Sequence, residues 1–256
     1  MIFTDTHTHL YLKQFDEDRA EVMKNAQNAN VERIFLPNVD EDTIGPMNQM
    51  ASDYPGICFP MMGLHPCSVE QNFKEVLGRM RTQLDTGNYV AVGEIGIDLY
   101  WDKSTLGIQV EAFKEQISWA KELNLPIVIH ARDSFDEIFE VVDEMNDDSL
   151  RGIFHCFTGN QQQANHILGY GGFLLGIGGV VTFKNGGLDK TLASVDLKHL
   201  VLETDAPYLS PVPFRGKRNE SAYIPYVAGK LSEIYSTSVE EIAKITTENS
   251  KLMFGV

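Results

Sequence analysis

Short apolar runs rich in β-branched residues recur eight times along the chain, and stretches of helical periodicity lie between most of them. This alternation restricts the fold strongly, because strands separated by helices pair in parallel and have their faces covered. The predicted strands are Met1–Thr6, Val31–Val39, Gly56–Gly63, Tyr89–Gly93, Pro126–Ile129, Arg151–Phe154, Gly172–Gly178 and His199–Leu202. The predicted helices are Asp16–Ala29, Asp42–Ser52, Val69–Thr86, Ile108–Asn124, Phe135–Glu144, Gln161–Gly169, Tyr223–Ile234 and Val239–Phe254.

The number of strands and the chain length together favour one architecture. Eight strands in 256 residues match a (β/α)8 TIM barrel, which takes roughly 250 residues. A doubly wound sheet also alternates strands and helices, but it usually has fewer strands and a glycine-rich turn after the first one, which is absent from this sequence. No linker or low-complexity tract divides the chain. We therefore expect an α/β fold, a single TIM barrel that spans residues 1–256.

Composition excludes several classes of protein. Acidic residues outnumber basic ones 36 to 21, and the net charge of −15 argues against a protein that coats duplex DNA with a basic face. No apolar stretch is long enough for a transmembrane helix, and the N-terminus does not resemble a secretory signal. Three cysteines without a CxxC motif are typical of a reducing compartment. We expect a cytoplasmic protein with no membrane contact and no obligate protein partner.

Side chains that can bind metal ions stand at the ends of the predicted strands. The C-terminal ends of barrel strands converge on one rim, where the active sites of this fold lie, so residues far apart in sequence are expected to meet there. The first strand ends with His7 and His9, and the others end with His65, Glu94, His130, His155 and Asp205.

The alternation of side chains along a strand predicts which neighbouring residues share a face with these candidate ligands. Residues two apart share a face, so Asp5 lies on the same inner face as His7 and His9, but deeper, where a hydrogen-bonding role in the core is expected. By the same rule Glu203 shares a face with Asp205 one step deeper, where it could either support a metal ligand by a hydrogen bond or contact a metal-bound water. If His155 faces the pocket, its neighbour Cys156 is expected to face the surrounding helices.

Imidazole nitrogens and carboxylate oxygens together favour Zn²⁺, Mn²⁺ or Mg²⁺ as the bound ion. Four histidines and two carboxylates exceed the needs of one tetrahedral ion, so the sequence predicts two divalent ions that share a carboxylate and a water. Such a pair activates the water for attack on a phosphoryl or carbonyl centre, and Asp205 could hold that water and take its proton.

Seven motifs in a fixed order carry a resemblance to a known family. They are Thr6–Leu10 (THTHL), Gly63–Pro66 (GLHP), Gly93–Asp98 (GEIGID), Ile129–Arg132 (IHAR), His155–Gly159 (HCFTG), Glu203–Leu209 (ETDAPYL) and Arg215–Glu220 (RGKRNE). In this set the chain resembles the TatD family of metal-dependent deoxyribonucleases, which are amidohydrolase-like TIM barrels. The last motif is usually followed by proline in that family, and here it is followed by Ser221.

The resemblance implies roles for individual residues. One metal ion would be held by His7, His9, Glu94 and Asp205, and the other by His130 and His155 together with the bridging Glu94. Catalysis would depend on Asp205, Glu94 and His65, with His65 beside the metals and in contact with substrate. A purely structural hydrogen bond for His65 is the alternative. The activity implied is hydrolysis of DNA phosphodiester bonds, 3′→5′ on single strands.

Several further residues are candidates for substrate binding. Arg132 shares a strand face with His130, and its guanidinium would need a phosphate or a carboxylate such as Glu203 beside it. The loop after the eighth strand, a frequent phosphate-binding position in barrels, contains Arg215, Lys217 and Arg218. Tyr100 and the following tryptophan could stack on a nucleobase. With so few cations, DNA ends, preferably single-stranded, are the expected partner.

Two alternatives stay open from the sequence. One is an amidohydrolase-type enzyme for another ester, a lactone or a phosphotriester. Many such relatives bridge their metals with a modified lysine on the fourth strand, whereas this chain has Glu94 at that point. The other is a non-catalytic metal-binding barrel, which the complete set of six ligands disfavours.

Overall fold

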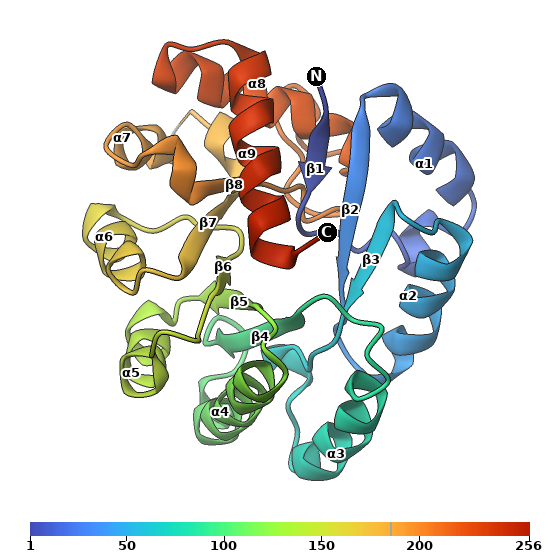
Figure 1. Ribbon diagram of the computed structural model, residues 1–256, viewed down its shortest axis with the longest axis vertical. Helices are drawn as coiled ribbons and strands as arrows, with labels where there is room; N and C mark the ends of the chain where they lie inside the picture. Colours follow the sequence, from blue (N-terminus) through green and yellow to red (C-terminus); the bar gives the residue numbers. More distant parts are fainter. Residues whose placement is uncertain (185) are drawn as a thin grey trace.

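The computed structural model describes residues 1–184 and 186–256, and it forms the predicted TIM barrel (Figure 1). All eight predicted strands are present. They are β1 (Phe3–Asp5), β2 (Val31–Pro37), β3 (Cys58–Met61), β4 (Val92–Asp98), β5 (Ile127–Arg132), β6 (Gly152–Phe154), β7 (Phe173–Ile177) and β8 (Leu200–Leu202).

The strands pair in parallel and in sequence order, and they form two ladders whose edge strands lie next to each other. One ladder runs β1-β2-β3 and the other runs β4-β5-β6-β7-β8. A few interactions at the strand ends cross both joins: Met62 bridges to Val92 between β3 and β4, and the Thr6 amide donates to the Leu202 carbonyl over 2.9 Å between β1 and β8. These interactions link the two ladders at both edges, although among the described residues no continuous ladder crosses either join.

Helices surround the strands, as Figure 1 shows, and each predicted helical stretch contains one. They are α1 (Arg19–Asn28), α2 (Glu41–Asp53), α3 (Phe73–Leu84), α4 (Leu106–Leu123), α5 (Phe135–Met145), α6 (Gln161–Gly169), α7 (Leu188–Leu192), α8 (Ile224–Tyr235) and α9 (Val239–Phe254). Helix α3 begins at Phe73 rather than at Val69, because Val69 has an extended backbone after the 3-10 turn Pro66–Ser68, and the short α7 was not predicted. Among the described residues, no helix is both long and apolar enough to cross a membrane.

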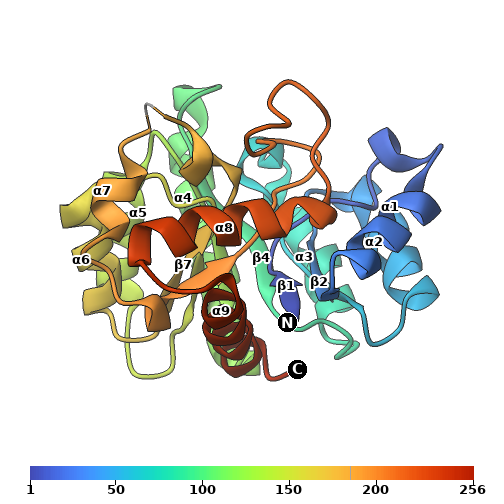
Figure 2. The ribbon, with the colours of Figure 1, turned by 90° about the horizontal axis from the view of Figure 1, so that it is seen from above.

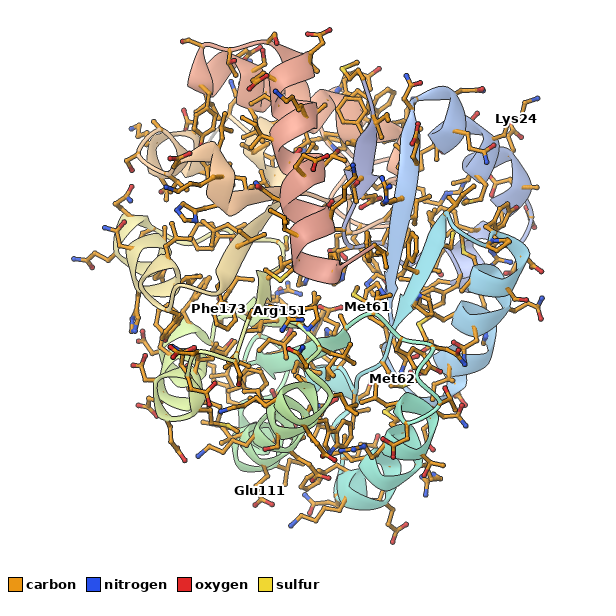
Figure 3. All side chains as sticks on the ribbon, in the orientation of Figure 1. Lys24, Met61, Met62, Glu111, Arg151 and Phe173 are labelled. Carbon is orange, nitrogen blue, oxygen red and sulfur yellow. The ribbon has the colours of Figure 1, made fainter. Side chains whose placement is uncertain are left out.

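Helix α9 covers the N-terminal end of the barrel. Asn249 donates to the Leu200 carbonyl at the start of β8 over 2.7 Å, and the Phe254 ring stacks on Phe35 inside the barrel with centroids 4.0 Å apart. Figure 2 shows α9 at the opposite end of the molecule from the long loops that follow the strands. Side chains such as Met61 fill the interior, whereas Lys24 and Glu111 point outward from the helices (Figure 3). Among the described residues, α9 thus covers one end of the barrel and leaves the C-terminal end for a site.

Two strands are longer than the sequence predicted. We expected Glu94 and His130 just beyond their strands, but β4 continues to Asp98 and β5 continues to Arg132. The extension follows from pairing, because Ile95–Asp98 run in register with Ile129–Arg132. His130 is therefore held within the ladder, and Glu94 lies at a bulge of β4 between two paired residues rather than in a loop.

Candidate metal centre

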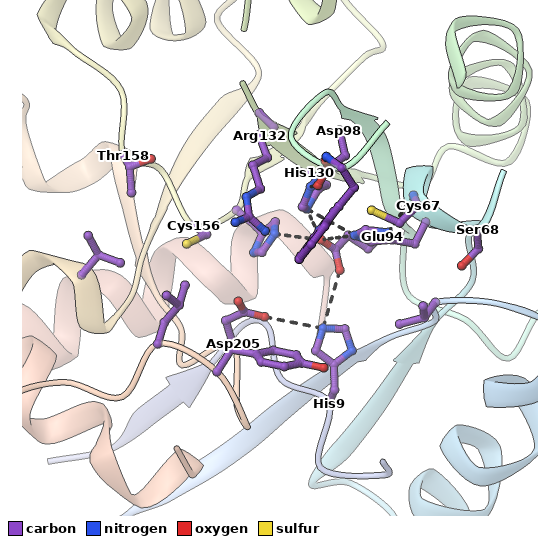
Figure 4. A pocket seen from close by; sticks show the side chains of 18 of the residues that line it. His9, Cys67, Ser68, Glu94, Asp98, His130, Arg132, Cys156, Thr158 and Asp205 are labelled. Carbon is purple, nitrogen blue, oxygen red and sulfur yellow. Dashed lines mark hydrogen bonds and ion pairs between the residues drawn. The ribbon is translucent and has the colours of Figure 1, made fainter. Parts of the chain in front are cut away.

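A cavity of about 650 Å³ opens at the C-terminal ends of the strands, and most of the predicted ligands line it (Figure 4). The predicted residues among its walls are His9, His65, Glu94, His130, His155 and Asp205. His7 is fully buried directly beneath it, within 3.3 Å of His9. The structure thus brings together residues that are separated by almost 200 positions.

Glu94 stands at the centre of this cluster, and its Oε2 atom faces one group of donors. His7 Nε2 lies 3.2 Å and His9 Nε2 lies 3.6 Å from this oxygen. Asp205 Oδ1 lies 3.8 Å from His7 Nε2 and 3.6 Å from His9 Nε2. Four donor atoms from β4 and from segments that follow β1 and β8 therefore face one point.

The other oxygen of the same carboxylate faces a second group. Glu94 Oε1 lies 2.8 Å from both His130 Nδ1 and His155 Nε2, and 3.4 Å from His65 Nε2. One carboxylate thus addresses two separate sets of imidazoles through its two oxygens.

The spacing of these atoms fits divalent ions. With ligand distances of about 2.1 Å, donors around a tetrahedral ion lie about 3.4 Å apart, and cis donors around an octahedral ion lie about 3.0 Å apart. The distances between neighbouring ligand atoms around Glu94 Oε2 are 3.2 to 3.8 Å. The residues present therefore fit a metal centre, and the Glu94 carboxylate is placed to bridge two ions.

The partners of His9 fix which of its nitrogens can bind a metal. Tyr11, which is 2% exposed, donates its hydroxyl hydrogen to the Pro37 carbonyl over 2.5 Å. The tyrosine oxygen must then accept from His9 Nδ1, which is 2.9 Å away. From this heavy-atom pattern we assign the hydrogen to Nδ1, so the lone pair of Nε2 faces the centre.

Asp98 determines which nitrogen of His130 can bind a metal, as Tyr11 does for His9. The sequence predicted no role for Asp98. Its Oδ2 lies 2.9 Å from His130 Nε2 and accepts that N–H, which leaves Nδ1 free to face Glu94. Burial opposes ionisation of Asp98, but the bond to His130 outweighs it and lowers the pKa of this carboxyl to about 2. The available signal was the strand alternation, which puts Asp98 on the same face as Glu94.

Glu203 lies behind His155 rather than among the cavity walls, which agrees with the expected alternative of a partner that supports a ligand and not with contact to substrate, water or Arg132. It is fully buried, and its Oε1 accepts from the Cys156 amide over 2.5 Å and lies 3.5 Å from His155 Nδ1. With a metal ion at the centre, a hydrogen on His155 Nδ1 would face Glu203 and leave the lone pair of Nε2 directed toward Glu94.

In His65 the nitrogen that faces the centre carries the hydrogen, in contrast to His9 and His130. Its Nδ1 accepts the Cys67 amide hydrogen over 3.1 Å, so in the neutral ring the hydrogen lies on Nε2. That nitrogen lies near Glu94 and His130, and the three residues could be read as a metal group by distance alone. The hydrogen on Nε2 instead favours a donor beside the centre, which agrees with the sequence expectation that His65 does not ligate.

Charge and burial explain why the central carboxylate is ionised. Burial opposes the charge on Glu94, but His155, His65 and His7 around it hold its pKa well below the usual value. Asp5, deeper in the barrel, has only neutral donors: Ser221 and Thr204 hydroxyls bond to it over 2.6 and 2.7 Å. Burial therefore raises the pKa of Asp5 to about 7, and its core hydrogen-bonding role is confirmed.

Cys156 lines the cavity, contrary to the prediction that it faces the helices. The strand β6 already ends at Phe154, and Cys156 has a left-handed backbone with φ of 47°. Strand alternation does not apply beyond the last strand residue, so the sequence rule failed there.

The predicted substrate-binding cations divide into two groups. Arg132 is exposed and lines the cavity, with its guanidinium 3.7 Å from the centre of the Tyr100 ring. Arg218 instead forms a two-point ion pair with Asp18 and also donates to the Gln14 carbonyl. It therefore anchors the loop after β8 to the segment after β1 and does not line the cavity.

The other two loop cations, Arg215 and Lys217, are exposed and do not belong to the cavity walls among the described residues. The Arg215 guanidinium stacks 3.8 Å from the centre of the Phe183 ring. Their contact with phosphate stays a prediction.

A TIM barrel with histidines and carboxylates gathered at the carboxyl ends of its strands is the architecture of a metal-dependent hydrolase. The model of the family described as TatD related DNase matches residues 4–255. The chain belongs to this family, and it is a metal-dependent hydrolase, as the motifs predicted.

The names of individual relatives agree with this family. An uncharacterized metal-dependent hydrolase, YabD of Bacillus subtilis (strain 168), is 41% identical over 257 residues, which cover 100% of both chains. A 3′-5′ ssDNA/RNA exonuclease TatD of Yersinia pseudotuberculosis serotype O:3 (strain YPIII) is 31% identical over 256 residues and 98% of each chain. The crystal structure of YJJV, a TatD homolog from Escherichia coli K12, superimposes with a TM-score of 0.93 at 29% identity, over 99% of this chain and 98% of that one.

Proposed function

We propose that this hydrolase removes nucleotides from the 3′ ends of single-stranded DNA with two divalent ions, Mg²⁺, Mn²⁺ or Zn²⁺. The observation that carries the proposal is the Glu94 carboxylate, whose two oxygens face two different sets of ligand atoms. The name of the Yersinia relative supports the substrate and polarity, and it adds RNA as a second substrate to test. We also propose that residues 1–256 form one domain.

The ligand sets we propose follow the geometry. His7, His9 and Asp205 would hold one ion and His130 and His155 the other, with Glu94 shared. When bound, two such ions would lower the pKa of an attacking water and neutralise charge on the phosphoryl group.

The side chains around the ions have separate tasks in this proposal. Asp205, 15% exposed at the mouth of the cavity, would orient the attacking water and accept its proton. His65 would donate its Nε2 hydrogen to a phosphate oxygen, because its other nitrogen is occupied by the Cys67 amide.

The shape and charge of the protein support a single-stranded substrate. A cavity of about 650 Å³ has room for about two nucleotides of one strand, whereas both strands of a duplex would have to separate to reach Glu94. With a net charge of −15, the protein would bind DNA weakly and lose affinity as salt is added. Equal trimming of blunt duplex and single strand at moderate salt would contradict this part of the proposal.

The test uses a 5′-labelled single-stranded oligonucleotide and metal-stripped enzyme reloaded with each ion in turn. Wild type should give a ladder that shortens from the 3′ end, and EDTA should abolish it. Glu94→Gln, which keeps the side-chain shape, should lose trimming and bound metal by mass spectrometry, whereas the exposed control Glu111→Gln should lose neither. Two bound ions without cleavage of DNA or RNA would discard the nuclease and direct the search to lactones, phosphotriesters and other esters.

A further inference from the structure

One cation at the rim of the cavity, Arg132, has no acidic partner within 4 Å among the residues that the structure describes. Arg132 is the only lysine or arginine among the cavity-lining residues that the structure describes. Across residues 1–184 and 186–256, its guanidinium forms neither a side-chain hydrogen bond nor an ion pair within 4 Å; its hydrogen bonds are made by the backbone, where the amide donates to the Ser134 hydroxyl and the carbonyl accepts from the Leu99 amide. Such a free guanidinium facing a cavity is suited to an anion that arrives with the substrate.

Aromatic rings hold this guanidinium by one face. It lies 3.7 Å from the centre of the Tyr100 ring and 5.5 Å from that of Trp101, and the two rings are perpendicular with centres 4.9 Å apart. Stacking covers the flat face of the guanidinium and leaves its N–H edge for a ligand.

One carboxylate connects the segment that carries Tyr100 and Trp101 to the candidate metal ligands. Asp98 Oδ1 accepts the backbone N–H groups of Tyr100 and Trp101 over 3.0 and 3.3 Å. Its Oδ2 holds His130, 2.9 Å away, so the rim and the candidate metal ligand share an anchor. In Figure 4, Arg132, Asp98 and His130 lie together on one side of the cavity.

The spacing along β5 indicates which anion would reach Arg132. It lies two residues beyond His130 on the same strand, so their backbones are about 7 Å apart. One nucleotide of a single strand spans a similar length. At a free 3′ end the strand continues only toward 5′, so the next available phosphate lies on that side of the bond to be cut.

We propose that Arg132, stacked on Tyr100, binds the phosphate immediately 5′ of the scissile one and thereby selects chain ends that carry at least two consecutive phosphates. This rests on the proposed function, since it presumes a nucleic acid strand with its 3′ end at Glu94. Arg132 would act on binding and alignment rather than on proton transfer.

The test removes one charge from each partner. We would follow the first cleavage of an all-phosphate octathymidylate and of the same strand with an uncharged methylphosphonate at the second linkage from the 3′ end. A strand with the methylphosphonate at the fifth linkage is the substrate control. In wild type, the second-linkage replacement should lower kcat/KM roughly 10-fold to 100-fold, because a charge-assisted hydrogen bond is lost.

Arg132→Met should be slow on the all-phosphate strand, and the second-linkage replacement should cost it little more, because the contact is already absent. The variant Arg151→Met, at the opposite end of the barrel where its guanidinium bonds Asn124, should retain the wild-type sensitivity. Tyr100→Leu should reduce the sensitivity in part.

Each other result overturns the inference. If wild type trims both strands equally, Arg132 reads no neighbouring phosphate although the nuclease stands. If Arg132→Met stays as sensitive as wild type, or if Arg215→Met is the insensitive variant, another residue binds that phosphate. If wild type does not trim the all-phosphate strand with any ion, the proposed function fails and this inference fails with it.

Discussion

Replacing Tyr11 by phenylalanine tests whether the tautomer of His9 is set by its buried neighbour. The substitution removes one oxygen atom, which accepts from His9 Nδ1 over 2.9 Å and donates to the Pro37 carbonyl over 2.5 Å. The ring itself stays, so the packing around it should change little.

The expected losses can be worked from these two bonds. The His9 Nδ1 hydrogen and the Pro37 carbonyl both lose their partner inside the protein, and an unsatisfied buried group costs about 1–3 kcal/mol. Loss of an outer hydrogen bond to a ligating histidine typically lowers metal affinity about 10-fold to 100-fold. Each tenfold corresponds to about 1.4 kcal/mol.

Calorimetric titration of metal-stripped protein with Zn²⁺ or Mn²⁺ measures the effect. In Tyr11→Phe, one of two binding steps should weaken, and the step that depends on His130 and His155 should stay. The matched control is Tyr235→Phe, whose hydroxyl donates to the Leu192 and Val195 carbonyls away from the cavity. It should lower stability without altering metal affinity. If Tyr11→Phe loses stability but binds both ions as wild type does, our assignment of the His9 hydrogen is refuted.

Three further predictions concern residues around the site. Because burial raises the pKa of Asp5 to about 7, the folded protein holds a proton that the unfolded chain has released above about pH 4, so stability should fall as pH rises from about 4 to 7, by up to about 1.4 kcal/mol per unit. Denaturant unfolding of metal-free Asp5→Asn should lack this slope; parallel slopes would contradict the argument. Gly176→Ala would place a methyl group 2.2 Å from Glu203 Oε2, and we expect a loss of about 1–3 kcal/mol in unfolding free energy together with weaker metal binding by calorimetry; wild-type values for both would show that Glu203 moves freely. Arg218→Met breaks the ion pair with Asp18 and should lower the free energy of unfolding by up to about 1 kcal/mol, whereas unchanged stability with a raised KM for DNA would return Arg218 to phosphate binding.

The barrel and the residues gathered at its rim could be predicted because both follow from regular periodicities. Strand alternation and the common direction of parallel strands are enough to bring His7, His155 and Asp205 to one end of the fold. The prediction needed no knowledge of contacts between side chains. It failed where regular structure ends, as at Cys156, whose left-handed backbone turns its side chain into the cavity.

Contacts between distant segments could not be predicted in the same way. Tyr11 meets the Pro37 carbonyl, and Arg218 meets Asp18 across 200 positions, through side-chain conformations that no spacing rule describes. Arg218 shows the consequence: as a charge in a loop it resembled a phosphate-binding residue, and only the position of Asp18 reveals that it is already neutralised. Composition counts cations, but pairing decides which of them are free, and Arg132 is the one that remains unpaired at the cavity among the described residues.

The fourth strand shows how one short sequence can organise the whole centre. Glu94, Gly96 and Asp98 alternate along one face of β4, and Gly96 pairs in register with His130 on β5. A Cβ atom at position 96 would lie 2.1 Å from the His130 carbonyl oxygen, so only glycine allows the two strands to approach this closely. The His130 ring can then reach both carboxylates, Glu94 through Nδ1 over 2.8 Å and Asp98 through Nε2 over 2.9 Å. Because Asp98 accepts the hydrogen bond from His130 Nε2, the lone pair of His130 Nδ1 faces the Glu94 carboxylate. A cation between His130 Nδ1 and Glu94 would then bind to both. A larger residue at position 96 should therefore displace the His130 backbone and weaken metal binding, although every ligand residue is retained.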